Sequence, residues 1–280
     1  MNAPERIPFL PDIQSLMDHR DLRIDAVGIK DVRYPMTIQA GATPQPTIAT
    51  ISMTVGLPAA TKGTHMSRFI ELLEAQTEAL NQEGLKTIVL DMLERLQACS
   101  GAVEIRFPYF VRKVAPVSGA QSQLDYEVCW QGIVSSKGQY LFRMRVRVPA
   151  TSLCPCSKEI SAYGAHNQRS QISIEAELAG EMAIEELIGI AERSASCEVY
   201  GLLKRWDEKY VTERAYDNPK FVEDLVRDVA LALNQESRVG AYVIEVENFE
   251  SIHNHSAFAR IARTTPTTRS MSSELVGQTS

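Results

Sequence analysis

Residues 140–148 read YLFRMRVRV, and this short run decides the fold class. From Phe142 onward apolar and arginine residues alternate, which places Arg143, Arg145 and Arg147 on one side of an extended chain. An amphipathic helix would instead repeat its apolar residues at roughly every third or fourth position. The run therefore predicts a β-strand with one apolar and one basic face, and we interpret the basic face as a solvated face of a sheet.

Outward from this strand, the hydrophobic pattern predicts strands and helices in separate groups. Predicted strands cover residues 46–57, 103–114, 124–134, 171–178, 240–248 and 256–262, and predicted helices cover residues 67–83, 85–99, 183–194, 207–215 and 219–234. Strands followed by helices and then strands favour antiparallel sheets with helices on one face over alternating βαβ units. The predicted fold class is therefore α+β, and the recurrence of the pattern suggests an internal duplication.

The same pattern divides the chain into regions. The first is an irregular arm rich in proline and turn-forming residues, with one short strand candidate; the second is the catalytic region; the last is a polar, aperiodic tail that we expect to be disordered. Their predicted limits are 1–45 for the arm, with the strand near 25–34, then 46–263 for the catalytic region, with approximate modules 46–150 and 151–263, and 264–280 for the tail.

Composition argues against several classes of protein. The chain has 280 residues and a net charge of −6, which disfavours a nucleic-acid binder because such proteins usually carry a basic face. No run of about 18 apolar residues occurs, and the N-terminus lacks a signal-peptide pattern, so we expect no membrane span. The expected compartment is the cytoplasm, where the five cysteines would stay reduced.

The segment TSLCPCSKEISAYGAHNQRS, residues 151–170, is the most informative for function. Its Cys154, Cys156 and His166 do not have the spacing of a zinc ribbon, which disfavours a structural zinc site. One thiolate, one imidazole and a more distant carboxylate would instead leave a coordination position open for water, as catalytic metal sites do. The alternative is that the cysteines are small buried apolar residues.

Two further clusters carry polar groups. In FESIHNHSAF, residues 249–258, His253 and His255 face the same way in an extended segment, with Glu250 close by. Chance clustering of surface histidines is the alternative.

In TKGTHMSRF, residues 61–69, the basic side chains Lys62, His65 and Arg68 stand where a helix is predicted to begin, an arrangement that suits phosphate. An ordinary capped helix start is the alternative there. Glu208 and Glu223 lie on helical patterns and would by pattern alone be solvated surface carboxylates.

Three of these motifs together resemble one family. LCPCSKEIS-x-YGAHNQRS, KGTHMSRF and ENFESIHNHSA look like the prokaryotic GTP cyclohydrolase type IB family, over roughly residues 20–263. The resemblance implies a bimodular tunnelling fold, in which each module is an antiparallel sheet with two helices on one face. It also implies that subunits pair their sheets into barrels with sites at their interfaces, so that the chain forms a homo-oligomer, expected to be a tetramer.

The resemblance assigns roles to residues at matching positions. Cys154, His166 and Glu208 match the metal-binding positions, and this donor set suits Zn²⁺ while leaving Mn²⁺ or Fe²⁺ tenable. Glu223 matches the position that anchors the purine. A carboxylate there would pair with guanine N1–H and the 2-amino group, a pair of donors that adenine lacks.

The implied reaction is hydrolysis of GTP at C8 of guanine to 7,8-dihydroneopterin 3′-triphosphate and formate, the first step of tetrahydrofolate biosynthesis. His253 and His255 would transfer protons, with Glu250 orienting one of them. Cys156 would transfer a proton near C8 or bind the metal, so the division of roles between Cys154 and Cys156 stays open. The triphosphate is expected to meet residues from the basic set Lys62, His65, Arg68, Lys158 and Arg169.

Two alternatives stand beside this reading. One is a 7-cyano-7-deazaguanine reductase on the same fold, which would use a nucleophilic cysteine and NADPH and would not need His166 beside Cys154. The other is a non-catalytic purine- or pterin-binding protein, which would have no use for an open metal position.

Overall fold

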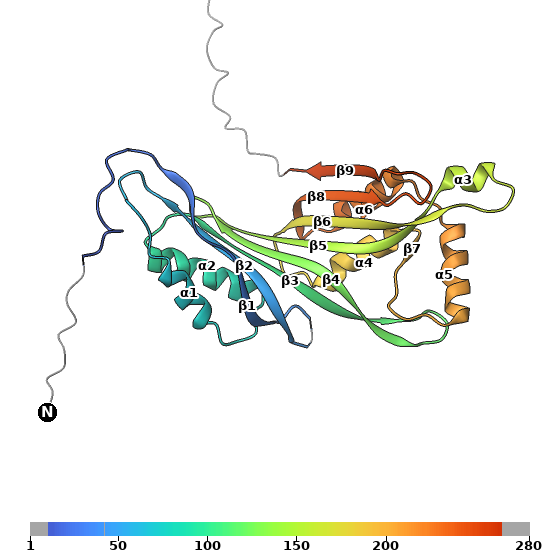
Figure 1. Ribbon diagram of the computed structural model, residues 1–280, viewed down its shortest axis with the longest axis horizontal. Helices are drawn as coiled ribbons and strands as arrows, with labels where there is room; N and C mark the ends of the chain where they lie inside the picture. Colours follow the sequence, from blue (N-terminus) through green and yellow to red (C-terminus); the bar gives the residue numbers. More distant parts are fainter. Residues whose placement is uncertain (1–10, 42, 265–280) are drawn as a thin grey trace, which may run out of the picture.

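The computed structural model describes residues 11–41 and 43–264, and in this part of the chain one antiparallel sheet carries the helices (Figure 1). The strands are β1 (Ile24–Ile38), β2 (Gln45–Leu57), β3 (Gly101–Val114), β4 (Gln121–Val134), β5 (Tyr140–Leu153), β6 (Asn167–Leu178), β7 (Cys197–Glu198), β8 (Val239–Asn248) and β9 (Ala257–Arg263). The helices are α1 (Ser67–Glu74), α2 (Gln82–Leu96), α3 (Pro155–Ile160), α4 (Ile184–Ser194), α5 (Arg205–Asp217) and α6 (Val222–Gln235). The α+β class predicted from the sequence is confirmed.

The strands follow the order of the chain across the sheet. The spatial order is β1-β2-β3-β4-β5-β6-β8-β9, and the short β7 pairs with β5 beside the place where β4 leaves it. The strand predicted from YLFRMRVRV is confirmed as the first part of β5, at the centre of the sheet. The edge strand β1 has two register shifts against β2, one on each side of Val27–Ile29, and Asp31 in the second shift has a φ of 56°.

The helices pack on the apolar face of the sheet in two groups. Helices α1 and α2 contact each other, and α2 lies against β3, β4 and β5; helices α4 and α6 contact each other and lie against β5, β6, β8 and β9 (Figure 1). Helix α5 stands at the far end of the sheet from α1, beside α3 (Figure 1). No helix within residues 11–41 and 43–264 is long and apolar enough to cross a membrane.

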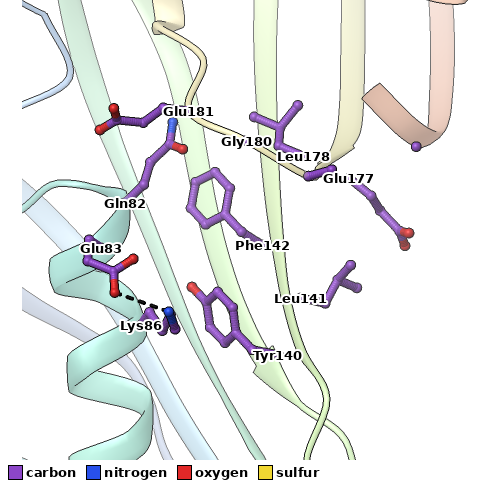
Figure 2. Close-up of a pocket in the computed structure, with 12 residues that line it drawn as sticks. Gln82, Glu83, Lys86, Tyr140, Leu141, Phe142, Glu177, Leu178, Gly180 and Glu181 are labelled. Atoms are coloured by element: carbon purple, nitrogen blue, oxygen red, sulfur yellow. Dashed lines mark hydrogen bonds and ion pairs between the residues drawn. The ribbon is translucent and has the colours of Figure 1, made fainter. Parts of the chain in front are cut away.

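An open cavity of about 710 Å³ lies between the start of α2, the start of β5 and the end of β6. Figure 2 shows its wall of Tyr140 and Phe142 from β5, facing the start of α2, where Lys86 forms an ion pair with Glu83 at 3.1 Å. None of the metal, catalytic or substrate-binding residues expected from the sequence lines this cavity.

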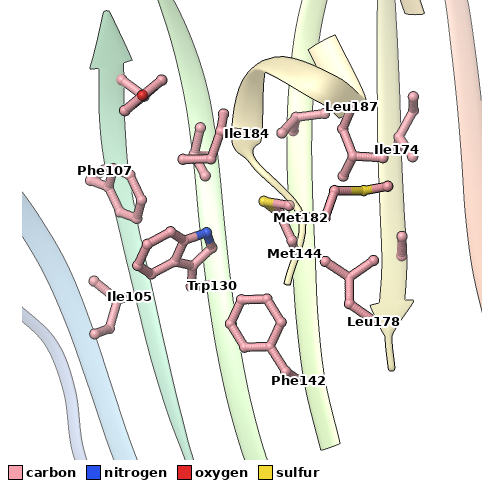
Figure 3. Close-up of a cluster of buried hydrophobic side chains, with 14 of the residues drawn as sticks. Ile105, Phe107, Trp130, Phe142, Met144, Ile174, Leu178, Met182, Ile184 and Leu187 are labelled. Carbon is pink, nitrogen blue, oxygen red and sulfur yellow. The ribbon is translucent and has the colours of Figure 1, made fainter. Parts of the chain in front are cut away.

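The core lies between the sheet and the helices, and its centre is aromatic. Trp130 is fully buried and makes edge-to-face contacts with Phe107, at a centroid distance of 5.3 Å, and with Phe142, at 6.0 Å. Figure 3 shows this cluster beside Met182 and Ile184, the first residue of α4. Because α1, α2, α4 and α6 all contribute residues to this one cluster, the two helix groups share a continuous core.

The opposite face of the sheet is charged, as the alternation in β5 predicts. Its three arginines form cross-strand ion pairs and are a third to a half exposed; the pairs are Arg143–Glu177 at 2.7 Å, Arg145–Glu175 at 3.1 Å and Arg147–Glu127 at 2.7 Å. Such exposed pairs contribute at most about 1 kcal/mol each. The stability of the sheet therefore comes from its other face.

Two predicted segment limits are wrong. The first helix ends at Glu74, not just before Gly84, which lies in the first turn of α2. Asn81 begins α2, because its Oδ1 accepts a hydrogen bond from the Gly84 N–H at 2.8 Å. Residues 24–38, which we expected to lie mostly in an irregular arm, form the full-length strand β1 because they pair with β2 along its length.

Residues 150–169, which the hydrophobic pattern left outside the predicted strands and helices, are also mostly regular. β5 continues to Leu153, α3 follows, and β6 begins at Asn167, because the β5–β6 ladder runs on to the pair Leu153–Asn167. Residue 150, the approximate limit between the predicted modules, thus lies inside β5, and the modular division itself stays a prediction. Apart from Thr264, the predicted disordered tail lies outside the described residues.

Candidate active site

The candidate site lies at the end of a row of β6 side chains that faces the helices. Side chains alternate along a strand, so residues two apart share a face. From the core outward this row is Leu178, Ala176, Ile174, Ile172, Ser170 and Gln168, all buried. The next position in the row is His166, just before the strand begins. The row therefore changes from apolar to polar as it approaches the candidate site.

Cys154 is held beside His166 by backbone hydrogen bonds. The Cys154 N–H donates to the His166 carbonyl at 3.1 Å, and the Ser157 hydroxyl accepts from the His166 N–H at 3.2 Å. Pro155 starts α3, where its missing N–H is not needed, and the Cys154 Sγ accepts from the Ser157 N–H at 3.4 Å. The motif thus forms a tight turn that holds the backbones of Cys154 and His166 together, with Cys156 exposed on α3.

The His166 ring has a polar neighbour on each side of its Nδ1. The Gln168 Oε1 lies 2.9 Å from Nδ1, and the Ser251 Oγ lies 3.2 Å from it. The Glu250 carboxylate is 4.0 Å away, beyond hydrogen-bond distance. With Nδ1 occupied in this way, Nε2 is the ring nitrogen left for a ligand.

The histidine motif meets the cysteine motif through Glu250. The Glu250 Oε2 lies 3.7 Å from the His253 Nδ1, and the His253 and His255 rings are stacked with centroids 5.2 Å apart. Glu250 is only 14% exposed, whereas His253 is 53% exposed. One shielded carboxylate therefore lies between two imidazoles, as proton transfer would require.

A buried hydrogen-bond network supports both motifs from below. The Ser152 and Ser170 hydroxyls are 2.7 Å apart, and Ser170 donates to the Asn248 Oδ1 at 2.7 Å. All three residues are at most 2% exposed. Asn248 ends β8, so the network fixes the point from which the segment with Glu250 leaves the sheet.

Glu208 and Glu223 lie on two helices at this end of the sheet, and both are exposed. Helix α6, which carries Glu223 in its first turn, is tied to the cysteine motif because the Lys220 N–H donates to the Leu153 carbonyl at 3.0 Å. Lys158 of α3 donates to the Tyr216 carbonyl at the end of α5, the helix that carries Glu208.

Asp207, the neighbour of Glu208, anchors α5. Its carboxylate accepts from the N–H groups of Val117, Ser118 and Lys204, each at 2.8 Å, and from the Ser118 hydroxyl at 2.5 Å. Burial alone would raise the pKa of this carboxyl, but the four hydrogen bonds hold the pKa well below its usual range. The anchored carboxylate fixes the start of the helix next to Glu208.

Lys62, His65 and Arg68 do not join the cysteine motif. They lie at the start of α1, at the opposite end of the sheet from α3 (Figure 1). His65 Nε2 is 3.0 Å from Asp12 Oδ1, and Arg68 Nη1 donates to the Arg95 carbonyl at 2.7 Å. Within one chain, the predicted phosphate cluster and the predicted metal ligands therefore lie at opposite ends of the sheet.

The predicted metal ligands fit a divalent metal in part. A thiol and an imidazole with an occupied Nδ1 are suitable donors, and metal-binding histidines characteristically have their other ring nitrogen hydrogen-bonded. Within residues 11–41 and 43–264, however, no three His, Cys, Asp or Glu residues lie close enough together to hold a metal. Glu208 is thus not brought to Cys154 and His166 in this structure.

Sequence reasoning missed several residues at this site, namely Gln168, Ser251, Asp207 and Asn248. Gln168 and Ser251 stand within or beside motifs that were recognised, so their positions in the sequence were a signal. Asn248 likewise lies within the recognised motif ENFESIHNHSA, whereas Asp207 gave no signal, because its partners Val117 and Ser118 lie far away along the chain.

Comparison with known proteins gives a consistent set of matches. A family model described as "Type I GTP cyclohydrolase folE2" matches residues 10–259. GTP cyclohydrolase FolE2 of Paraburkholderia xenovorans is 60% identical over 94% of this chain and 98% of its own. GTP cyclohydrolase FolE2 1 of Dechloromonas aromatica is 58% identical over 93% of this chain and 98% of its own. Among solved structures, the uricase of Arthrobacter globiformis has a similar fold, with a TM-score of 0.52 at 8% identity over 87% of this chain and 94% of that one.

Proposed function

The chain belongs to the FolE2 family of type I GTP cyclohydrolases, and from that premise we propose how its residues carry the reaction. It is a GTP cyclohydrolase, which converts GTP to 7,8-dihydroneopterin 3′-triphosphate and formate in the first step of tetrahydrofolate biosynthesis. The observation that carries the site assignment is the Cys154–His166 pair, joined by backbone hydrogen bonds and with the imidazole Nδ1 already engaged.

Cys154 and His166 would hold a divalent metal, Zn²⁺, Mn²⁺ or Fe²⁺, with Glu208 as the third protein ligand. Bound there, the metal would supply a Lewis acid and a water of lowered pKa for hydrolysis at C8. The chain's part is to hold the donors: the turn at Pro155 fixes the thiol, Gln168 engages the imidazole, and Asp207 fixes the helix start next to Glu208.

Glu223 would select guanine. Its carboxylate has no hydrogen-bond or ion-pair partner among the described residues, and it lies in the first turn of α6, which Lys220 ties to the strand end at Leu153. Two acceptor oxygens on one carboxylate match the adjacent N1–H and 2-amino donors of guanine. Adenine presents an acceptor at N1 and lacks the amino group, so it would leave the carboxylate unpaired.

Proton transfers would fall to the histidine motif. Glu250 lies between His166 and His253 and is shielded from solvent, and His255 stacks on His253, which gives a short chain of groups able to pass protons. Cys156, exposed on α3 one residue beyond Pro155, would transfer a proton near C8 or act as a further metal ligand.

We further propose that the site is completed between subunits of a homo-oligomer, expected to be a tetramer. The support is the distance along the sheet between α1, which carries Arg68, and α3, which carries Cys156 (Figure 1). In one chain the basic cluster Lys62, His65 and Arg68 cannot reach a triphosphate bound near Cys154, but a second chain can supply it. Lys158 and Arg169 are nearer alternatives on the same chain.

The same reasoning extends to the fold. We assign it to the bimodular tunnelling superfamily, with two helices on one face of each module's sheet. The support is that two strands, two helices and two strands, β1 to β4 with α1 and α2, are followed by a second set from β5 to β9. The cytoplasmic location stays a prediction.

A metal-titrated turnover assay tests the proposal. Chelator-stripped protein receives Zn²⁺, Mn²⁺, Fe²⁺ or Mg²⁺ separately, while formate release and the fluorescence of oxidised neopterin are read together. We expect a transition metal to restore both signals in the wild type and neither signal in Cys154→Ala. Absence of both signals with every metal, together with NADPH oxidation in the presence of a deazaguanine nitrile, would show the reductase instead.

A further inference from the structure

Gln168 is a buried polar residue in a row that is apolar from Leu178 to Ile172 and polar from Ser170 onward. It is 8% exposed and points to the same side of β6 as Ile172 and Ile174. A leucine of similar size would fill such a position without the cost of burying an amide, which is roughly 1–3 kcal/mol unless the amide is hydrogen-bonded. The partner that the structure gives it is the Nδ1 of His166, at 2.9 Å.

An amide oxygen decides which nitrogen of a neutral imidazole carries the proton. An amide oxygen has no hydrogen and can only accept, so a hydrogen bond to the Gln168 Oε1 requires the proton on the His166 Nδ1. The lone pair is then on Nε2. A neutral histidine with the proton on Nε2 has no lone pair there and cannot bind a metal through that atom.

The other two neighbours of this ring do not make the same selection. The Ser251 Oγ, at 3.2 Å, is a hydroxyl that accepts or donates and therefore fits either tautomer. The Glu250 carboxylate, at 4.0 Å, is too far for a hydrogen bond. Gln168 is also the most restrained of the three, because it lies within β6 in the ladder with Ser152.

We propose that Gln168 is a positioning residue that holds His166 in the tautomer with its proton on Nδ1 and so reserves Nε2 for the metal. This inference rests on the proposed role of His166 as a metal ligand. It adds a residue that acts through its hydrogen bond to His166. Partners of this kind commonly change metal affinity by about 10–100-fold when they are removed.

The test uses three variants of the full-length protein. Gln168→Leu keeps the volume and removes the acceptor, while Gln168→Glu keeps an acceptor at the same place. Ile172→Val is the matched control, because it changes a buried side chain of the same row of β6 that belongs neither to the polar network nor to the surroundings of His166. Thermal unfolding of each variant shows that the fold is retained.

The first readout needs neither metal nor substrate. ¹⁵N NMR of the metal-free protein, above the pH range in which imidazoles titrate, reports which ring nitrogen is protonated, and His166→Ala assigns the signal. We expect the proton on Nδ1 in the wild type, Gln168→Glu and Ile172→Val, and a shift toward Nε2 in Gln168→Leu. A wild-type His166 with its proton on Nε2 would overturn the proposal.

The second readout is Zn²⁺ affinity, measured by competition with a chromophoric chelator. Gln168→Leu should bind about 10–100-fold more weakly, whereas Gln168→Glu and Ile172→Val should stay close to wild type. Wild-type affinity in a folded Gln168→Leu protein would also contradict the proposal. Failure of the wild type to release formate from GTP would contradict the proposed function alone, because the tautomer is read without GTP.

Discussion

The middle and the end of the β5–β6 ladder differ in the kind of side chain that they bury. In the middle, Met144 and Ala176 are paired beside the fully buried Trp130, and the surroundings are apolar. At the end, Ser152 and Gln168 are paired, and a polar network replaces the aromatic cluster. The same two strands therefore carry a packed core in one half and the floor of the candidate site in the other.

The two regions also differ in whether their buried polar atoms have hydrogen-bond partners. Near the core, the Trp130 Nε1 and the Tyr140 hydroxyl are buried without a hydrogen-bond partner among the described residues, whereas the hydroxyls of Ser152 and Ser170 are both paired. An unpaired buried donor costs about 1–3 kcal/mol, which the large buried area of an aromatic ring offsets. The core thus gains stability from close aromatic packing even where a buried polar atom has no hydrogen-bond partner. At the site, the hydroxyls are hydrogen-bonded and so held in fixed orientations. Variants at the site should change activity and spare stability, and variants of the core should do the reverse.

The largest expected effect is on the site, in Glu223→Ala. Removing the proposed guanine anchor should lower kcat/KM for GTP by about 10⁴-fold while bound metal and the unfolding midpoint stay at wild-type values. The measurement is formate release, with elemental analysis of the same sample. Normal kinetics in this variant would refute the anchor role.

Trp130→Ala tests the core side of the comparison. Loss of this buried ring should lower the free energy of unfolding by about 3–5 kcal/mol. Urea denaturation gives the value, and metal content per folded chain should not change. A comparable loss of metal would mean that the two halves of the ladder are not separable.

Cys154→Ala tests a proposed metal ligand of the site. It removes a proposed ligand, so metal affinity should fall by more than the roughly 100-fold that is the upper limit for removing a residue hydrogen-bonded to a ligand. Stability of the metal-free protein should change little, because the thiol is only partly buried. Full metal occupancy by elemental analysis would move the ligand role to Cys156.

Asp207→Asn should give the smallest effect, because asparagine keeps one acceptor oxygen. The pKa of Asp207 is lowered in the folded protein from an ordinary value of 3.8, so the ionised carboxylate stabilises the fold above that pH and ceases to do so as pH falls through the lowered pKa. The difference in urea midpoint between wild type and variant should therefore be largest near neutral pH and shrink below about pH 4. A constant difference would show that ionisation does not matter there.

The central part of the fold follows from local pattern, whereas its far ends do not. The period of two in β5 is a property of nine consecutive residues, and it correctly gives both the strand and its charged face. The start of β6 was missed because residues 167–170 are polar. They become strand only through pairing with the end of β5.

The same distinction holds at the site. Cys154 and His166 stand twelve positions apart in one motif, so their proximity could be predicted. Asp207 looks like any surface carboxylate on a helix, since its partners Val117 and Ser118 come from a turn about ninety residues earlier. Pairings of that range depend on the whole topology, and no local pattern contains them.

The open edge at β1 has a consequence for aggregation. A long, flat edge strand offers unpaired N–H and C=O groups to any other extended chain, and proteins commonly blunt such edges with bulges and charges. In β1 the two register shifts and the positive φ of Asp31 interrupt the first half, and the charges of Asp31 and Arg33 add to this protection. Leu80 covers the end of the strand, because its N–H donates to the Thr37 carbonyl at 2.8 Å. The regular stretch from Val32 to Met36 is then the part that a solubility screen should examine first.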